Sequence, residues 1–319
     1  MRKVLSVSIA AYNVDKYLND VLSCFLAEEV LEKSEIIIVS DGSTDQTPVI
    51  ARKYVEKYPD TFILIDKQNG GWGSTLNAAM KIATGKYFKQ LDGDDLFEIE
   101  QLPLYLKALE EKEADVIVTP YRSFDDKTGE EIETIVEAKD LPRNQMLSIA
   151  DVASQMNVAM HACAFKTEVL RRGKVELTEK CFYTDAEFTL KALNHSSTVE
   201  FVDILVYLYR LSRSGQSVSN EGLKKHYLEH HKVLLGLLKY ETEEAKEEYK
   251  TFFKKKIEEM VGIQYAIFMM LEPSKLHQKE FKEFDTIMKE RYPQYYPAGG
   301  KKLKLLRMSK FMLYPLIVR

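Results

Sequence analysis

The sequence predicts an α/β fold with a mostly parallel central sheet, helices on both faces and a helical C-terminal region. Short apolar runs alternate with helical patterns through the first third of the chain, and these runs stay apolar at successive positions. Such strands are typical of a parallel sheet that helices cover on both sides. The last third is rich in Lys, Glu and Leu and shows little strand signal.

The elements follow in order along the chain. Strands are expected at 4–11, 36–39, 62–65, 87–91, 115–119, 131–136 and 199–209. Helices are expected at 16–31, 47–58, 74–83, 100–112 and 185–194, and a helical pattern covers 222–292. We therefore expect an α/β domain over residues 1–220 and a helical region over residues 221–319.

Composition and charge exclude several classes of protein. The 319 residues are 45% hydrophobic and 29% charged, which is typical of a globular protein and not of a disordered chain. Lys and Arg number 45 against 49 for Asp and Glu, so the net charge of −4 gives no general attraction for nucleic acid. Three scattered cysteines do not suit a disulfide framework, which favours a reducing, cytoplasmic compartment.

Both ends of the chain bear on localisation. Tyr12 and Asn13 interrupt the N-terminal apolar run, so it predicts a buried strand rather than a signal peptide. No run of about 18 apolar residues predicts a membrane-spanning helix. Segment 301–319 is basic and contains no acid, and a helical wheel places its apolar residues opposite its basic ones. It predicts either a helix lying on an anionic membrane or a packed terminal helix with a solvated basic face.

Polar residues follow four of the predicted strands, in segments 11–13, 40–45, 69–74 and 92–95. Ligands of open α/β sheets bind beyond the carboxyl ends of the strands, so these segments form the candidate site. The last contains Asp92, Asp94 and Asp95, which repel one another unless a cation neutralises them. Hard oxygen ligands suit Mg²⁺ or Mn²⁺. Aspartates also form tight turns and helix caps, but their place after an apolar strand favours a metal site.

The two middle segments predict a pocket lined by backbone. Asp41 ends a strand, where its carboxylate can accept hydrogen bonds from a base or a sugar, while Ser43 or Thr44 caps the next helix. Segment 69–74 has three glycines in four positions and opens a helix, so its backbone can approach a ligand closely. It matches neither a dinucleotide fingerprint nor a P-loop, which argues against a dehydrogenase and an NTPase.

Together these motifs resemble the nucleotide-sugar half of family 2 glycosyltransferases, which are inverting enzymes with the Rossmann-like GT-A fold. The shared motifs are Tyr12-Asn13, Asp-Gly-Ser-Thr-Asp at 41–45, Asn-Gly-Gly at 69–71 and Asp-x-Asp-Asp at 92–95. Their order and spacing agree over about residues 4–122. The resemblance continues more weakly at 183–188 and 209–213 and fades beyond about residue 220.

The resemblance implies a role for each matching position. Asp94 would hold the metal on the diphosphate, Asp92 would lie at the ribose, and Asp95 would lie near the donor sugar or the metal. Asp41 would face the edge of the base. The other positions expected to line the donor pocket are Ala11, Tyr12, Asn13, Asn69, Gly70, Gly71 and Gly93.

The family takes its catalytic base from a Glu-Asp pair. Here Thr184 stands in place of the Glu and Asp185 matches the Asp, so we expect Asp185 to be the base, with Glu187 as the alternative. Arg210 and Arg213 either hold phosphates of the donor or of a lipid acceptor, or are solvated surface residues.

Two further residues have open roles. His161 lies in an apolar stretch and is expected to be a core or subsite residue rather than a metal ligand. Trp72 either stacks on a sugar or a base or anchors its loop.

The predicted function is that of a metal-dependent, inverting glycosyltransferase of the hexosyltransferase type. With Mn²⁺ or Mg²⁺ it would move a sugar from a nucleotide-diphosphate donor, UDP-linked, to a glycan or lipid-linked acceptor in cell-surface polysaccharide synthesis. We expect it in the cytoplasm, with peripheral contact to the inner face of the plasma membrane if the tail binds lipid. The alternatives are a noncatalytic nucleotide-sugar-binding protein and a nucleotidyltransferase, and the second typically has a Gly-rich basic loop that does not follow the first strand here.

Overall fold

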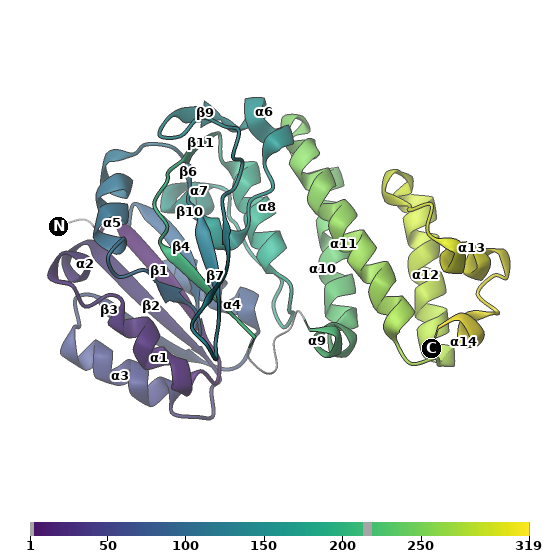
Figure 1. The fold of residues 1–319 in the computed structure, drawn as a ribbon, viewed down its shortest axis with the longest axis horizontal. Coiled ribbons are helices and arrows are strands. Elements are labelled where there is room, and N and C mark those ends of the chain that lie inside the picture. The colour runs from purple at the N-terminus through teal and green to yellow at the C-terminus, as the bar shows by residue number, and fades with distance from the viewer. Residues whose placement is uncertain (1–2, 213–218, 319) are drawn as a thin grey trace. The chain divides into compact units, whose positions relative to one another are not determined.

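The computed structural model describes residues 3–212 and 219–318, and the chain divides into two compact units. We call Met1–Ser214 with Lys246–Phe252 the sheet unit, and Gly215–Ala245 with Phe253–Arg319 the helical unit (Figure 1). The predicted fold class is confirmed, since an α/β part with a mostly parallel sheet is combined with a helical C-terminal part. The division expected at residue 220 stays a proposal.

An eight-stranded sheet forms the centre of the sheet unit. Its strands are β1 (Leu5–Ala11), β2 (Ser34–Asp41), β3 (Phe62–Lys67), β4 (Tyr87–Asp92), β6 (Val116–Val118), β9 (Met146–Ser148), β10 (Cys163–Lys166) and β11 (Thr198–Phe201). They lie in the order β3-β2-β1-β4-β10-β6-β11-β9. The first four strands of this order are parallel, as is the β6–β11 pair, while β10 and β9 run antiparallel to their neighbours.

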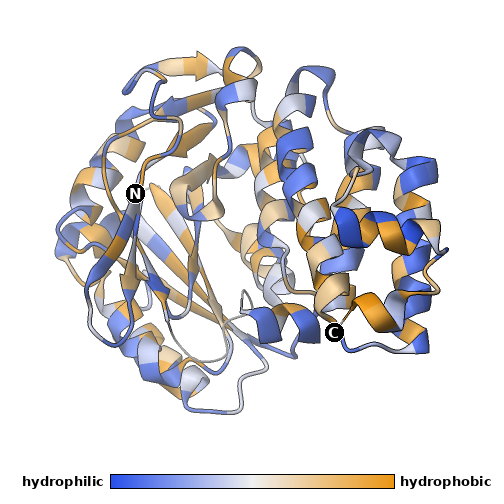
Figure 2. Ribbon diagram, turned by 45° about the vertical axis from the view of Figure 1, so that its right-hand side comes forward, coloured by the Kyte–Doolittle hydropathy of each residue, from blue (hydrophilic) through white to orange (hydrophobic). Residues whose placement is uncertain are grey.

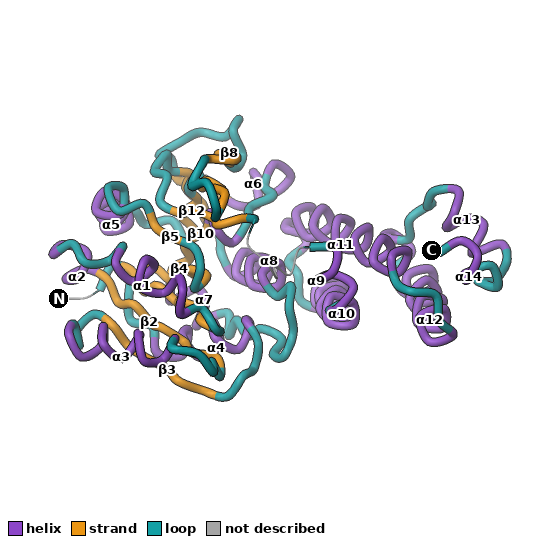
Figure 3. The backbone as a smooth tube through the Cα atoms, turned by 60° about the horizontal axis from the view of Figure 1, so that its bottom comes forward, coloured by secondary structure: helices purple, strands orange, loops and turns teal. Residues whose placement is uncertain are grey.

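Helices lie on both faces of this sheet (Figure 3). They are α1 (Asp15–Ser23), α2 (Glu28–Lys33), α3 (Thr47–Lys57), α4 (Trp72–Ile82), α5 (Leu102–Glu111), α6 (Ile149–Val152), α7 (Thr167–Arg172) and α8 (Asp185–His195). Short 3₁₀ turns complete the unit: η1 (Ala153–Gln155), η2 (Met160–Ala162) and η3 (Glu247–Tyr249). The single helix expected over 16–31 is wrong. The chain turns after α1 because Phe25 enters the core and packs edge-on against Phe97.

The burial of the strands explains why their apolar runs are continuous. Every residue of β2 is buried, and the strands of the sheet contain hydrophobic stretches (Figure 2). On β1, Leu5, Val7 and Ile9 join a core cluster with residues of α1 and α5. The opposite face of β1 and β2 lies against α4. Because β1 to β4 are parallel, the segments that follow them meet at one edge of the sheet.

A second sheet covers one side of this edge. It contains β5 (Leu96–Phe97), β12 (Tyr207–Leu211), β7 (Tyr121–Asp125) and β8 (Glu131–Ile135), in that order. The single strand expected over 199–209 is therefore wrong, because β11 pairs with β6 and β9 while β12 pairs with β5 and β7. The change of sheet carries Tyr207 and Arg210 to the loop that follows β4.

The helical unit contains α9 (Asn220–Lys225), α10 (Tyr227–Glu243), most of α11 (Lys250–Met270), α12 (Lys275–Arg291), η4 (Pro293–Tyr295), α13 (Lys301–Met308) and α14 (Tyr314–Ile317). Among the described helices, we find none with the length and apolar character needed to cross a bilayer. Segment 301–319 does not form the single helix on which the helical-wheel prediction was based. It turns after Met308, where Lys310 and Phe311 have φ angles of 50° and 67°.

Candidate functional site

The segments that follow β1 and β2 are hydrogen-bonded to each other. The backbone N–H of Asn13 donates to Ser43 Oγ (3.2 Å), and the N–H of Thr44 donates to Asn13 Oδ1 (2.8 Å). Asn13 has a φ of 53°, a left-handed conformation that Asn tolerates better than most residues. Ala11 is buried beneath this turn, whereas Tyr12 is 54% exposed. The ring of Tyr12 is therefore accessible to a ligand.

Asp41 is a buried anchor for the glycine loop, which we define as residues 69–74. Its Oδ1 accepts hydrogen bonds from Lys67 Nζ (2.6 Å) and the N–H of Gly70 (2.9 Å), and its Oδ2 accepts one from the N–H of Gly71 (2.8 Å). Asn69 Nδ2 donates to the Asp41 carbonyl (2.9 Å). The structure thus gives Asp41 a supporting role that sequence reasoning missed, and its contact with a base stays a prediction.

The glycine loop can pack closely because it lacks side chains at critical points. Gly71 has a φ of 80°, and a Cβ there would lie 3.1 Å from the backbone nitrogen of Cys181. A Cβ on Gly73 would lie 2.5 Å from the carbonyl oxygen of Thr178. The loop therefore contacts the segment that leads into α8, where the predicted base lies.

The side chain of Trp72 attaches the acidic loop, residues 92–95, to the glycine loop. Trp72 Nε1 donates to Asp92 Oδ1 at 2.7 Å, and Gln90 Nε2 donates to the same oxygen at 2.5 Å. A Cβ on Gly93 would lie 2.7 Å from the Ala10 carbonyl oxygen, so the tight turn requires glycine. Of the two roles considered for Trp72, these contacts favour the anchor.

Asp95 is the buried end of the acidic loop. Its Oδ2 accepts a hydrogen bond from the Tyr207 hydroxyl (2.5 Å), and its Oδ1 accepts one from the N–H of Arg210 (2.7 Å). Burial raises the pKa of Asp95 well above its usual range, and the charges of Asp94 and Asp92 raise it further. Both donors come from β12, where the chain has passed from the first sheet to the second. The sequence around Asp95 therefore does not reveal this environment.

Arg210 supports the same loop through its side chain. Its Nε donates to the Asp94 carbonyl (2.6 Å), and its Nη1 pairs with the Asp126 carboxylate (2.8 Å). The guanidinium carbon also lies 4.9 Å from the ring centres of Tyr17 and Phe124. These contacts orient the backbone of Asp94, and a phosphate contact of Arg210 stays a prediction. Arg213 lies outside the described residues.

His161 lies beside the acidic loop, although the two are far apart in sequence. Its ring stacks on Tyr209 with 4.4 Å between ring centres and meets Tyr207 edge-on at 4.9 Å. Both ring nitrogens are buried, and neither has a hydrogen-bond partner among the described residues. Ligand atoms of Asp92, Asp95 and His161 lie within 4.8 Å of one another. Two carboxylates and an imidazole at this spacing suit a divalent cation.

The environment of His161 keeps its ring neutral. Burial, together with the charge of Lys89, lowers the pKa of His161 to about 3. A neutral imidazole is the form that binds metal ions. The expectation that His161 is a core or subsite residue rather than a metal ligand stays a prediction, although a His161 nitrogen lies near ligand atoms of Asp92 and Asp95.

Asp185 is the first residue of α8, and its side chain is exposed. Burial raises the pKa of the Tyr209 hydroxyl, and the charges of Asp92, Asp94, Asp95 and Asp185 raise it further. The charges of the predicted base and of the three acids in the acidic loop thus all raise the pKa of the same residue, Tyr209. All four carboxylates therefore lie near Tyr209, while the role of Asp185 as the base stays a prediction.

Glu187, the alternative base, has a structural role. Its Oε2 accepts a hydrogen bond from the N–H of Thr178 (2.9 Å), and its Oε1 pairs with Lys191 (2.7 Å). The side chain is buried and holds the segment before α8. The hydroxyl of Thr184, which replaces the family's Glu, is buried and has no partner among the described residues.

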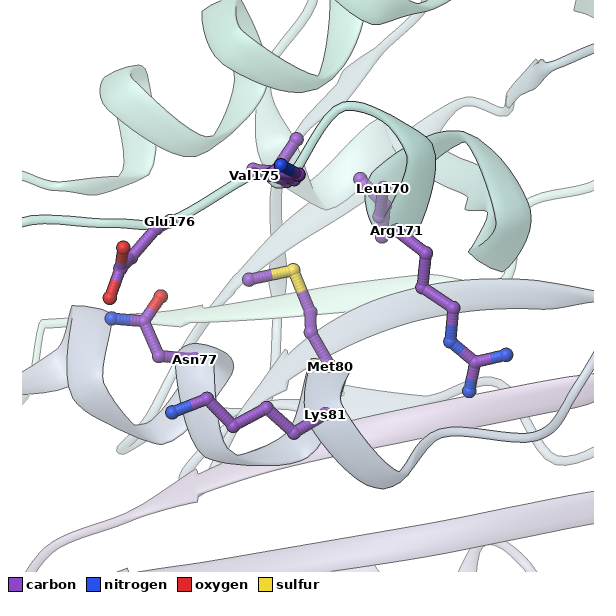
Figure 4. A pocket seen from close by; sticks show the side chains of 8 residues that line it. Asn77, Met80, Lys81, Leu170, Arg171, Val175 and Glu176 are labelled. Carbon is purple, nitrogen blue, oxygen red and sulfur yellow. The ribbon is translucent and has the colours of Figure 1, made fainter.

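A surface pocket lies elsewhere, between α4 and the end of α7 (Figure 4). It is lined by Asn77, Met80, Lys81, Leu170, Arg171, Lys174, Val175 and Glu176. None of these residues is one of the predicted site residues, and Asn77 is already bound to the backbone of Leu177 through both ends of its amide. We therefore assign this pocket no part in the candidate site.

The fold and these loops define a Rossmann-like protein of the GT-A type, in which polar loops gather beyond the carboxyl ends of parallel strands. The chain belongs to glycosyltransferase family 2. The family model described as "Glycosyl transferase family 2" matches residues 6–173, which include the glycine loop, the acidic loop and His161.

Curated relatives and solved structures agree with this assignment. The minor teichoic acid biosynthesis protein GgaB of Bacillus subtilis is 28% identical over 221 residues, which are 66% of this chain and 23% of GgaB. The putative glycosyltransferase EpsH of the same species is 24% identical over 98% of this chain and 93% of its own length. The crystal structure of Staphylococcus aureus TarS 1–349 in complex with UDP-GlcNAc has a TM-score of 0.66 at 17% identity, and covers 98% of this chain and 89% of TarS 1–349.

Proposed function

We propose that the protein transfers a sugar from a nucleotide-diphosphate donor, a UDP-sugar, to a glycan or lipid-linked acceptor in cell-surface polysaccharide synthesis. The observation that carries this proposal is the meeting of the acidic loop, the glycine loop and the start of α8 at one edge of the sheet. The UDP-GlcNAc complex of TarS and the teichoic acid role in the name of GgaB support the donor and the acceptor class.

The donor pocket is proposed to lie across the four strand ends. Tyr12 is accessible beside the turn of Asn13. Asp41 is proposed to contact the base, by the resemblance to the family. The backbone of the glycine loop would approach the diphosphate closely, since Gly70 and Gly71 carry no side chain. The remaining proposed donor contacts are Ala11, Asn69, Asp92, Gly93, Asp95, Arg210 and Arg213.

We further propose that a divalent cation, Mn²⁺ or Mg²⁺, takes part in the reaction. Bound at the acidic loop, such a cation would neutralise the negative charge that grows on a departing nucleotide diphosphate. Asp94 is the proposed metal residue by resemblance, and the cluster of Asp92, Asp95 and His161 offers further ligand atoms. Support comes from a mannosyltransferase of Pyrobaculum calidifontis, solved with GDP-Man and Mn2+, which has a TM-score of 0.54 at 15% identity.

Asp185 is the proposed catalytic base. Its exposed carboxylate at the start of α8 can accept the proton of an acceptor hydroxyl while that oxygen attacks the anomeric carbon. A single displacement inverts the anomeric centre and needs no covalent enzyme intermediate. The buried Glu187 is less suited to this step because Thr178 and Lys191 already occupy its oxygens.

The proposed organisation assigns donor binding and catalysis to residues 1–220 and leaves residues 221–319 as a helical region. We propose a cytoplasmic location for two reasons. The cysteines favour a reducing compartment, and nucleotide sugars are donors inside the cell. Cys24, Cys163 and Cys181 are all buried and free, which agrees with this proposal.

The test is a calorimetric screen of nucleotide sugars against the full chain, with Mn²⁺ and with EDTA, followed by a transfer assay with the donor that binds. We expect one UDP-sugar to bind and to be transferred or slowly hydrolysed, with inversion seen by NMR. Binding without transfer or hydrolysis would instead indicate a noncatalytic nucleotide-sugar-binding protein. Release of pyrophosphate from a nucleoside triphosphate would indicate a nucleotidyltransferase.

A further inference from the structure

Four large apolar side chains of the C-terminal segment are exposed to solvent. Leu305 is 45% exposed, Met308 82%, Met312 72% and Leu316 65%. The last three exceed every other large hydrophobic side chain that the structure describes. Single exposed apolar residues are ordinary on protein surfaces, but such a concentration within twelve positions indicates an interaction surface. We call these four residues the tail patch.

The rest of the segment is packed inside the helical unit, so the tail patch is not part of a loose end. Leu306 and Tyr314 are fully buried, and Phe311 meets Phe281 of α12 edge-on at 5.1 Å. Arg307 donates to Asp285 Oδ1 through its Nε (2.9 Å) and its Nη2 (2.8 Å). These contacts anchor α13 and α14 within the helical unit (Figure 1, yellow). The side chains of the tail patch stay exposed to solvent.

Four lysines accompany the tail patch on the same short segment. Lys301, Lys302, Lys304 and Lys310 are all exposed, and in the described part of the chain none of them forms an ion pair. Residues 301–319 contain no Asp or Glu. Arg307 is the exception among the described basic residues of the segment, because Asp285 neutralises it internally. The described part of the segment therefore exposes both large apolar side chains and unpaired basic ones.

We propose that the tail patch and its four lysines dock the helical unit on an anionic lipid surface. Apolar side chains flanked by lysines suit the boundary of a bilayer, where methionine and leucine enter the headgroup region and the ammonium groups meet lipid phosphates. A second copy of this chain fits less well, since pairing two such surfaces brings like charges together. This inference does not depend on the proposed transferase activity.

The test is cosedimentation of the full chain with vesicles of phosphatidylglycerol and phosphatidylcholine in a one-to-one ratio, and with vesicles of phosphatidylcholine alone. We expect binding to the anionic vesicles that weakens with added salt, and little binding to the neutral ones. The triple variant Lys301→Gln, Lys302→Gln, Lys304→Gln should bind on the order of a hundredfold more weakly, at about fivefold for each lysine near the surface.

The apolar contribution is tested with the double variant Met308→Ser, Met312→Ser, which should bind about tenfold more weakly. Its control is Ile99→Ser, Leu104→Ser, because those side chains are 53% and 54% exposed in the sheet unit. The control for charge is Lys53→Gln, Lys57→Gln, Lys107→Gln, which removes the same charge from exposed lysines outside the helical unit. Both controls should bind anionic vesicles as the unaltered chain does.

The proposal fails if the unaltered chain does not bind anionic vesicles, or if the tail variants bind as tightly as their controls. It also fails if sedimentation velocity shows a dimer that Met308→Ser, Met312→Ser abolishes, since a second copy would then cover the tail patch. Donor affinity by calorimetry, measured on every variant, should stay unchanged. That measurement separates loss of docking from loss of the fold or of the proposed function.

Discussion

The indole N–H of Trp72 donates to the carboxylate of Asp92 at 2.7 Å, and this hydrogen bond joins the glycine loop to the acidic loop. Both loops depend on residues elsewhere in the sheet unit, through Asp41 for the first and Tyr207 and Arg210 for the second.

Trp72→Phe keeps an aromatic ring in the glycine loop but removes the bond to Asp92. A hydrogen bond to a charged group contributes about 1.5 to 3 kcal/mol, so donor affinity should fall by about tenfold to a hundredfold. Calorimetry with the donor measures this change. Tyr54→Phe is the control, because it removes a hydrogen bond to the Asn19 carbonyl. Equal donor affinity of Trp72→Phe and the unaltered chain would show that the indole N–H does not contribute to donor binding.

Asp185→Asn should abolish most of the transfer while leaving donor binding intact. The exposed side chain supports no described core contact, so the melting temperature should stay within a few degrees. Loss of a catalytic base lowers the rate by about a hundredfold to ten-thousandfold. Glu187→Gln is the comparison and should mainly lower stability, since Thr178 and Lys191 lose a charged partner. Full transfer activity in Asp185→Asn would exclude it as the base.

Metal removal and two substitutions test the acidic loop. EDTA should abolish transfer, and Mn²⁺ should restore it. Asp94→Asn and His161→Phe should each weaken Mn²⁺ binding by about tenfold or more if both residues hold the ion. Electron paramagnetic resonance of bound Mn²⁺ should also show coupling to an imidazole nitrogen that His161→Phe removes. His231→Phe, in the helical unit, is the control for loss of a histidine.

Unchanged Mn²⁺ affinity in His161→Phe would return this residue to its expected role in the core or a sugar subsite. Unchanged affinity in Asp94→Asn would contradict the role that the resemblance assigns to Asp94.

Lys89 predicts a specific dependence of stability on pH. It is fully buried and donates to the carbonyls of His161 (2.7 Å) and Cys163 (3.2 Å), and burial lowers its pKa to about 7 from 10.5. Between these two values the unfolded chain binds a proton that the folded chain lacks. The free energy of unfolding should therefore rise with pH from about 7 upward, by at most about 1.4 kcal/mol per pH unit.

Lys89→Met should remove this rise, which urea unfolding at pH 7, 8 and 9 measures as a growing difference between the two proteins. The matched control is Lys239→Met, whose side chain is 68% exposed and should leave the pH dependence unaltered. Parallel curves for Lys89→Met and the unaltered chain would show that the Lys89 ammonium stays charged in the folded protein.

Much of the fold follows from local pattern. The run 36–39 is apolar at every position because β2 is buried on both faces. Asp92 is the last residue of β4, and Asp94 and Asp95 follow it. Continuous apolar runs and strand-end motifs are properties of neighbouring residues, so a single sequence contains them. The resemblance to family 2 glycosyltransferases depends on the order of these motifs.

The predicted elements are wrong where long-range contacts decide the structure. The run 199–209 has continuous strand character, yet it divides between two sheets because each half finds a different partner. The tail has one amphipathic pattern, yet it turns after Met308, and Arg307 points to Asp285 rather than to solvent. The strands that pair with β11 and β12, and the Asp285 that pairs with Arg307, all lie far from these residues in the sequence.

The sequence by itself determined the α/β class, the strand ends that carry the polar loops and the identity of the acids. Only the tertiary structure decided which residues meet those acids: His161, Tyr207 and Arg210 join Asp92, Asp94 and Asp95 from segments far along the chain. The reason is physical. Secondary structure depends on residues a few positions apart, whereas hydrogen bonds, burial and pKa shifts depend on distances that only the folded chain defines.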